Sequence, residues 1–323
     1  MTPNGKPGSD RNTILRIAPR IEEGETVRIV ILGTGALGCV FAARLAAVAE
    51  VWMLGAWAEG IAAVQRRGIA IHEPDGSLTQ VQVMAGSDPA AAAPADCALV
   101  LVKSYQTGRA AAWAARVLAA AGLAVTLQNG LDNGPILAAA VGAERSAVGV
   151  TYVGATLLGP GEARLAACQP TFIGPARGAD RLAALLNAAG LEAHVTAAIT
   201  EQLWGKVVAN AAINPLTALW HASNGELLAS AERRALLAAL AAEAAAVARG
   251  LGCSLPCDDP AVYVEQVCRA TAANRSSMLQ DVLAGRPTEI DSINGALIAE
   301  GRRLGIPTPY NEAVWRLVRG LTV

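Results

Sequence analysis

A glycine-rich turn between a predicted strand and a predicted helix constrains the fold of this chain more than any other feature. The apolar, β-branched run Val27–Leu32 predicts a strand, and a helical pattern extends from the turn through Ala47. The turn itself reads Gly33-Thr34-Gly35-Ala36-Leu37-Gly38. In this context Gly33 allows a tight turn, Gly35 lets backbone approach a pyrophosphate, and Gly38 permits close helix packing. Because a helix start offers free N–H groups to phosphates, the motif predicts dinucleotide binding.

Strand and helix patterns alternate from Val27 to about Thr196, the order typical of a parallel sheet covered by helices. The segment Arg109–Ala121 has the composition and length of a helical crossover. We therefore predict an α/β, Rossmann-like domain over residues 27–196. Its predicted strands are Val27–Leu32, Glu50–Leu54, Cys97–Val102, Leu123–Leu127, Ala147–Val153, Thr171–Ile173 and Glu192–Val195.

The two ends of the chain differ from this α/β segment. After about Ala197 the strand patterns stop, and helical patterns interrupted by Gly and Pro predict an all-α domain over residues 197–323. In this domain the alanine-rich helix Glu232–Arg249 is expected to end with Gly250 as its C-cap. Residues 1–26 are rich in Gly, Pro and charge and lack the apolar block of a signal peptide, so they predict a flexible extension, with a short helix around Ile14.

Composition narrows the class of partner. The formal net charge is -1 and no basic run is interleaved with aromatic residues, which argues against nucleic acid. No segment reaches the roughly 18 uninterrupted apolar residues needed to cross a bilayer. The 6 cysteines are scattered and the 3 histidines have no partner pattern, so neither disulfides nor a metal site are predicted. We expect a soluble cytoplasmic protein that binds small molecules.

Lysine is rare in this chain, and the positions of the few lysines indicate where proton transfer takes place. Among 26 basic residues only Lys6, Lys103 and Lys206 are lysines. Unlike Arg, a Lys in apolar surroundings can lower its pKa and give up a proton. Lys206 lies in the helical segment Leu203–Pro215, where Asn210 and Asn214 share its face. A solvated stripe is the alternative, but Asn is a poor helix former, which favours a functional face. Pro215 should kink or end this helix and free nearby carbonyls.

Two further polar clusters are ambiguous on their own. Asn274, Ser277 and Asp281 have helical spacing and predict either an exposed face or part of a site. Gln128-Asn129-Gly130 follows a predicted strand and fits either an ordinary turn or a ligand site at the carboxyl end of that strand. The second strand is followed by Ala56, without an acid for a ribose, so the sequence leaves NAD and NADP open.

With these motifs the chain resembles the ketopantoate reductase (2-dehydropantoate 2-reductase) family from Val27 to Gly320. The resemblance implies a Rossmann domain joined to a helical domain like that of 6-phosphogluconate dehydrogenase. It also implies NADPH-dependent reduction of the 2-oxo acid ketopantoate to pantoate, and a homodimer as a family-level expectation. The matching motifs are the glycine turn, Val-Lys-Ser-Tyr-Gln around Lys103, Gln-Asn-Gly at 128–130, Asn-Gly-Glu-Leu at 224–227, Ser-Ser-Met-Leu-Gln-Asp at 276–281 and Thr-Glu-Ile-Asp at 288–291.

The resemblance also assigns roles to single residues. It implies that Lys206 is the general acid. The substrate's carboxylate, ketone and hydroxyl would be bound by Asn129, Asn210, Asn214, Asn224 and Ser277. The cofactor would contact the turn Gly33, Thr34, Gly35, Ala36, Leu37 and Gly38, together with Lys103, Asn129, Ala155 and Glu289.

The sequence departs from the family at one position and leaves two other functions open. The family usually has an Arg where this chain has Ala56, to pair with the 2′-phosphate of NADPH. NADH is therefore an alternative cofactor, unless Arg66 or Arg67 supplies the missing charge. A reductase of another 2-oxo acid, such as an aromatic one, is the first rival function. A non-catalytic NAD(P)H sensor is the second, and the pairing of Lys206 with Asn210 argues against it.

Overall fold

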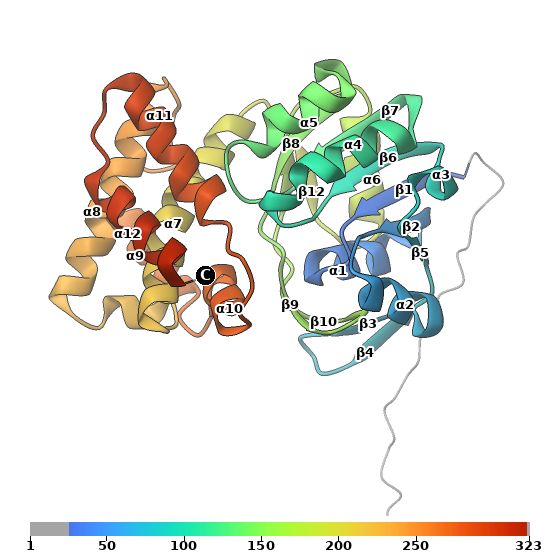
Figure 1. Ribbon diagram of the computed structural model, residues 1–323, viewed down its shortest axis with the longest axis horizontal. Coiled ribbons are helices and arrows are strands. Elements are labelled where there is room, and N and C mark those ends of the chain that lie inside the picture. Colours follow the sequence, from blue (N-terminus) through green and yellow to red (C-terminus); the bar gives the residue numbers. More distant parts are fainter. Residues whose placement is uncertain (1–25, 322–323) are drawn as a thin grey trace, which may run out of the picture.

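The computed structural model describes residues 26–321, which form an α/β domain beside an all-α domain (Figure 1). The predicted fold class, a Rossmann-like domain followed by a helical one, is confirmed. The predicted extension over residues 1–26, with its short helix around Ile14, lies outside the described residues apart from Thr26.

An eight-stranded sheet forms the centre of the α/β domain, in the order β12-β11-β8-β7-β6-β1-β2-β5. All seven predicted strands are present, Glu50–Leu54 and Thr171–Ile173 with the predicted bounds and the other five with shifted ends. Most neighbours are parallel, but β11 runs antiparallel to β8, so the sheet is mixed rather than wholly parallel. The strands are β1 (Arg28–Leu32), β2 (Glu50–Leu54), β5 (Met84–Gly86), β6 (Ala95–Val100), β7 (Leu118–Thr126), β8 (Ser146–Thr151), β11 (Thr171–Ile173) and β12 (Ala193–Val195).

Helices cover both faces of this sheet because alternate residues of each strand point in opposite directions. Ile29 and Ile31 of β1 pack in the core beneath α1, whereas Val30 and Leu32 pack in the core beneath α4. Helix α1 ends at Leu45, two residues before the predicted end. The helices of this domain are α1 (Ala36–Leu45), α2 (Ala58–Arg67), α3 (Pro89–Ala92), α4 (Thr107–Val117), α5 (Asn133–Val141) and α6 (Ala179–Ala188).

The predicted crossover helix Arg109–Ala121 is wrong at its C-terminal end. Helix α4 stops at Val117, and Leu118–Ala121 already belong to β7. Three consecutive alanines, Ala119 to Ala121, made this stretch look helical in the sequence. Pairing with β6 overrides that propensity, because Ala95 of β6 lies opposite Leu118 in the parallel ladder.

Sequence reasoning missed a second, four-stranded sheet of order β4-β3-β10-β9. Its strands are short, and β10 reads Glu-Ala-Arg-Leu-Ala-Ala, a composition that favours helix. The sheet is stabilised by α1, since Ile71, Val81 and Ala163 share one buried core with that helix. The strands are β3 (Ile69–His72), β4 (Leu78–Val81), β9 (Gly154–Gly159) and β10 (Glu162–Ala167).

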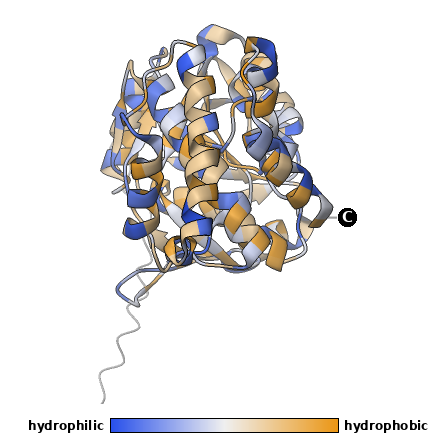
Figure 2. Ribbon diagram, turned by 90° about the vertical axis from the view of Figure 1, so that its left-hand side faces the viewer, coloured by the Kyte–Doolittle hydropathy of each residue, from blue (hydrophilic) through white to orange (hydrophobic). Residues whose placement is uncertain are grey.

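From Ile199 onward the described chain is helical, as predicted. Helices α7, α8 and α12 surround a core of Leu, Val and Ala side chains. Viewed from the side of this domain, apolar and polar segments alternate along its helices (Figure 2). The elements are α7 (Ile199–Trp220), α8 (Ala231–Gly250), α9 (Pro260–Ala270), α10 (Ser277–Leu283), α11 (Ala296–Leu304) and α12 (Pro309–Leu321), with a π-helical turn at Asp291–Gly295.

Pro215 does not end its helix, although it frees a carbonyl as predicted, and the predicted C-cap at Gly250 is wrong. Helix α7 continues through Pro215 to Trp220. The carbonyl of Ala211, which Pro215 cannot bond, instead accepts a hydrogen bond from Nδ2 of Asn294 at 2.9 Å. Helix α8 includes Gly250, and the chain turns away at Gly252, where φ is 72°. Of the described helices, none is long and apolar enough to cross a membrane.

Candidate active site between the two domains

The glycine turn forms one wall of a cavity of about 540 Å³ that lies where β1, β2 and β6 end. The opposite wall comes from α10 and the segment after it in the helical domain. This cavity lies at the carboxyl ends of parallel strands, where open α/β sheets bind their ligands. Its lining includes Gly33, Thr34, Gly35, Ala36, Leu37, Lys103, Asn129, Ala155, Ser277 and Glu289 from the predicted site.

The local geometry of the turn fits a dinucleotide pyrophosphate. Gly33 has φ 133°, and a Cβ there would lie 2.9 Å from the backbone of Leu101. A Cβ on Gly38 would lie 2.1 Å from the carbonyl oxygen of Gly33, so α1 is pressed against its own turn. A Cβ on Gly35 would meet nothing within 4 Å. Since no side chain caps α1, its first N–H groups are open to an anion.

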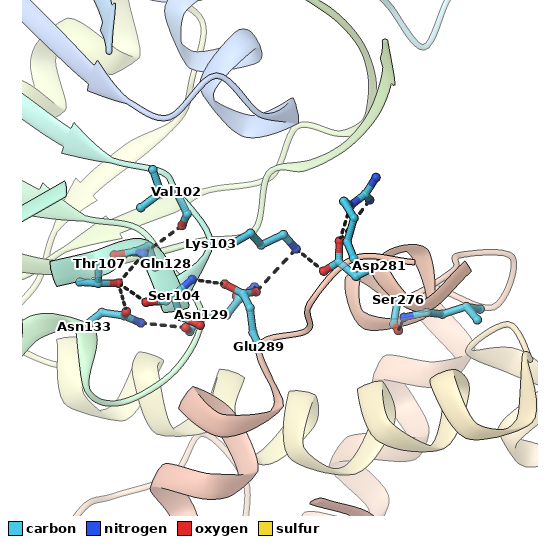
Figure 3. Close-up of polar contacts among 12 residues, drawn as sticks. Val102, Lys103, Ser104, Thr107, Gln128, Asn129, Asn133, Ser276, Asp281 and Glu289 are labelled. Carbon is cyan, nitrogen blue, oxygen red and sulfur yellow. Dashed lines mark hydrogen bonds and ion pairs between the residues drawn. The ribbon is translucent and has the colours of Figure 1, made fainter. Parts of the chain in front are cut away.

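An ion-pair network joins the two domains across this cavity (Figure 3). Nζ of Lys103, just after β6, lies 2.6 Å from Oδ2 of Asp281 and 3.9 Å from Oε2 of Glu289. Arg286 donates to Oδ1 of Asp281 from Nε at 3.2 Å and Nη2 at 3.1 Å. Burial lowers the pKa of Lys103, but the charges of Glu289 and Asp281 outweigh it and raise that pKa overall. Lys103 is therefore a fixed cation.

Glu289 connects the helical domain to two loops of the α/β domain. Its Oε1 accepts the backbone N–H of Ser104 at 3.1 Å, and its Oε2 accepts Nδ2 of Asn129 at 3.2 Å (Figure 3). Gly130 has φ 109°, and a Cβ there would lie 2.5 Å from the carbonyl oxygen of Ser292. The Asn-Gly pair is thus both a turn and a contact between domains, which orients Asn129 toward the cavity.

Lys206 lies between the domains rather than in bulk water. Its Nζ donates to the carbonyl oxygen of Thr151, at the end of β8, over 2.6 Å. The same ammonium lies 5.6 Å from the ring centroid of Tyr152. Burial lowers the pKa of Lys206 to about 8, and the charge of Glu289 partly opposes this shift. Lys206 does not line the cavity at the glycine turn, but Glu289, which does line it, acts electrostatically on both lysines.

The other predicted substrate residues separate into three groups. Ser277 begins α10 and lines the cavity, together with Asn129. Asn210 and Asn214 follow Lys206 along α7, the first half-buried and the second buried. Asn224 is buried away from the cavity, where its Nδ2 donates to Oγ1 of Thr271 at 2.8 Å.

The structure corrects two sequence-based expectations. Asn274 precedes α10 in an exposed turn, so only Ser277 and Asp281 of that cluster are helical. Arg66 and Arg67, in the last turn of α2, do not line the cavity that contains Ala56.

Sequence reasoning also missed several residues of the cavity. Gln106 belongs to the Val-Lys-Ser-Tyr-Gln motif, which could have indicated it. Gln280 likewise belongs to the Ser-Ser-Met-Leu-Gln-Asp motif, whereas Arg109 and Arg286 have no local signal in the sequence. The residues missed are Tyr105, Gln106, Arg109, Gln280 and Arg286. Asp281, whose role the sequence left ambiguous, also lines the cavity.

No group of three or more His, Cys, Asp or Glu side chains among residues 26–321 is arranged to hold a metal ion.

Comparisons with known proteins agree with this architecture. Residues 29–178 match the family model described as ketopantoate reductase PanE/ApbA, and residues 198–322 match the model of its C-terminal domain. A 2-dehydropantoate 2-reductase of Halobacterium salinarum is 35% identical over 91% of this chain and 98% of its own.

Solved structures give the same result. A PanE/ApbA family ketopantoate reductase from Ralstonia eutropha JMP134 is 33% identical, with TM-score 0.85 over 92% of this chain and 98% of its own. A D-mandelate dehydrogenase solved with NADH and anilino(oxo)acetate has TM-score 0.86 over 92% of this chain and 98% of its own, but at 24% identity it shares the fold alone. With both domains matched in order, the chain belongs to the ketopantoate reductase family.

Proposed function

We propose that this protein reduces ketopantoate to pantoate with a nicotinamide dinucleotide, preferably NADPH, and that Lys206 donates the proton. The relative from Halobacterium salinarum named 2-dehydropantoate 2-reductase supports the reaction, since this chain covers 98% of it. The observation that carries the assignment of Lys206 is an ammonium held between the domains with its pKa lowered to about 8. Such a group is mostly protonated at neutral pH yet gives up its proton far more readily than an ordinary lysine.

The dinucleotide supplies the hydride when bound, and the residues of the chain supply the rest. Lys206 exchanges its hydrogen bond to Thr151 for one to the ketone oxygen, and then protonates that oxygen as negative charge develops. Asn210 and Asn214 extend from the same face of α7 and offer amide donors to the substrate. A cation fixed in a cleft with little water stabilises a developing oxyanion more strongly than it would in solution.

Ser277 and Asn129 are the residues proposed to bind the substrate beside the cofactor. Both line the cavity, one from each domain. Glu289 orients Asn129 and attracts the ammonium of Lys103, so it would hold both side chains in position beside a bound cofactor. Asn224 stays a predicted substrate residue, although its Nδ2 already bonds Thr271 in this conformation.

A substrate panel tests this proposal. Oxidation of NADPH and of NADH is followed in parallel with three 2-oxo acids at matched concentration: ketopantoate, 2-oxoisovalerate, which lacks the hydroxyl, and benzoylformate, which is aromatic. We expect the highest kcat/KM with ketopantoate. A higher value with benzoylformate would make the protein a reductase of a different 2-oxo acid. Tight cofactor binding without oxidation by any of the three would favour a sensor.

A further inference from the structure

The segment after β2 brings no cation into the cavity. The segment after β2 lines the cavity with Gly55, Ala56 and Trp57, and none of these is charged. In folds of this kind the adenosine ribose lies beside the end of the second strand. Arg66 and Arg67 do not reach it: Arg67 instead lines a separate hollow of about 190 Å³ and donates to the carbonyl oxygen of Pro160 at 3.3 Å.

Two other arginines line the cavity, and they differ in how their charge is used. Arg286 is neutralised by the buried carboxylate of Asp281, which it contacts through both Nε and Nη2. Arg109 is exposed and forms none of the ion pairs found within residues 26–321. Its Cζ lies 5.6 Å from the ring centroid of Trp113, one turn further along α4. Arg109 is therefore the cation of the cavity whose donors are free.

Arg109 lines the same cavity as Ala56, which lies two residues after the end of β2. It lies in the first turn of α4, two residues after the helix begins at Thr107. Ala110 and Ala114 of this helix belong to the same buried core as Leu54, the last residue of β2. The start of α4 and the segment after β2 therefore both border the cavity that the glycine turn lines.

We propose that Arg109 binds the 2′-phosphate of NADPH and thereby determines the preference for the phosphorylated cofactor. This inference rests on the proposed function, since it assumes that the cavity holds a nicotinamide dinucleotide. A guanidinium offers several donors in one plane, which suits the oxygens of a phosphate. Contact with the Trp113 ring orients that plane while leaving its edge free for the phosphate.

Calorimetric titration of the full chain with NADPH and with NADH tests the inference without requiring turnover. In the Arg109→Ala variant the affinity for NADPH should fall at least about tenfold, the usual effect of losing a charge-assisted hydrogen bond. The affinity for NADH should stay within about twofold, which also shows that the variant is folded. The preference of the wild type for NADPH should shrink as the salt concentration is raised, because the proposed interaction between Arg109 and the 2′-phosphate is ionic.

Arg66→Ala is the matched control, because it removes an exposed arginine outside the cavity and should leave both affinities unchanged. The inference is overturned if Arg66→Ala removes the NADPH preference, if Arg109→Ala weakens both cofactors equally or neither, or if the wild type prefers NADH. In each of these cases ketopantoate reduction can still be observed in the substrate panel. Failure of the wild type to bind either dinucleotide would instead overturn the proposed function, and this inference with it.

Discussion

The proposed cofactor side and the proposed substrate side of this molecule are built in different ways. The cofactor side uses backbone: residues 33–35 form a turn that leads into α1 at Ala36, and its shape depends on the glycines at positions 33, 35 and 38. The substrate side uses side chains from α7, α10 and the segment around Glu289, together with loops of the other domain. The first is fixed by local sequence, whereas the second exists only when the two domains are packed together.

The two lysines of the site show what this difference means for chemistry. Lys103 faces two carboxylates, so the pKa of its ammonium is raised despite burial. Lys206 faces a carbonyl oxygen and an aromatic ring, so burial dominates and its pKa is lowered to about 8. The same residue type thus has a raised pKa in one place and a lowered pKa in the other, and the second suits the proposed role of proton donor. The neighbours brought by the fold decide which pKa each lysine has.

Replacing Lys206 should give the largest difference between the two sides, because turnover should fall while cofactor affinity is kept. We expect Lys206→Met to lower kcat by about 10²–10⁴-fold, the usual contribution of general acid catalysis. Lys206→Arg should lose most of its turnover as well, since Arg keeps the charge but gives up a proton poorly. Cofactor affinity, measured by calorimetry, should change little in both variants. Lys6→Met, which alters a lysine outside the described residues, is the control, and near wild-type turnover in Lys206→Arg would remove Lys206 from its role.

Two glycine substitutions should affect the cofactor side in different ways. In Gly38→Ala the new methyl would lie 2.1 Å from the carbonyl oxygen of Gly33, so the backbone must shift. We expect a loss of about 1–3 kcal/mol in the free energy of unfolding, measured by denaturant titration, together with weaker cofactor binding. In Gly35→Ala the methyl meets only open space, so stability should be kept while cofactor affinity falls. Equal stability loss in both variants would contradict this distinction.

The lowered pKa of Lys206 predicts how turnover and the free energy of unfolding change with pH. These effects should be smaller than those of the substitutions above. Turnover should be nearly constant below a pH of about 8 and fall about tenfold per pH unit above it, as the proton donor is lost. Stability should respond in the opposite direction. Between about 8 and the ordinary lysine value of 10.5, the unfolded chain binds more protons than the folded one, so the free energy of unfolding rises with pH. Both trends should be absent in Lys206→Met, and their persistence there would assign them to another group.

Much of the fold could be predicted because its signals are local. Seven of the eight strands of the main sheet, all except β5, and the change to helices after Thr196 follow from periodicity and β-branched composition. The second sheet was missed because β10 consists mostly of Ala and charged residues, and it becomes a strand only by pairing with β3 and β9. The sequence predicted that Pro215 frees a carbonyl but not that the helix continues past it, since the partner of that carbonyl, Asn294, lies 83 residues away in the chain.

The sequence by itself determined the glycine turn, the order of the two domains and the residue types suited to proton transfer, because each of these depends on neighbours within a few positions. Only the tertiary structure decided that two carboxylates raise the pKa of Lys103 and that burial lowers the pKa of Lys206. It alone also placed Asp281, Arg286 and Arg109 at the cavity and kept Arg66 and Arg67 out of it. The physical reason is that pKa values and charge pairing depend on burial and on distances of a few ångströms between residues far apart in the chain.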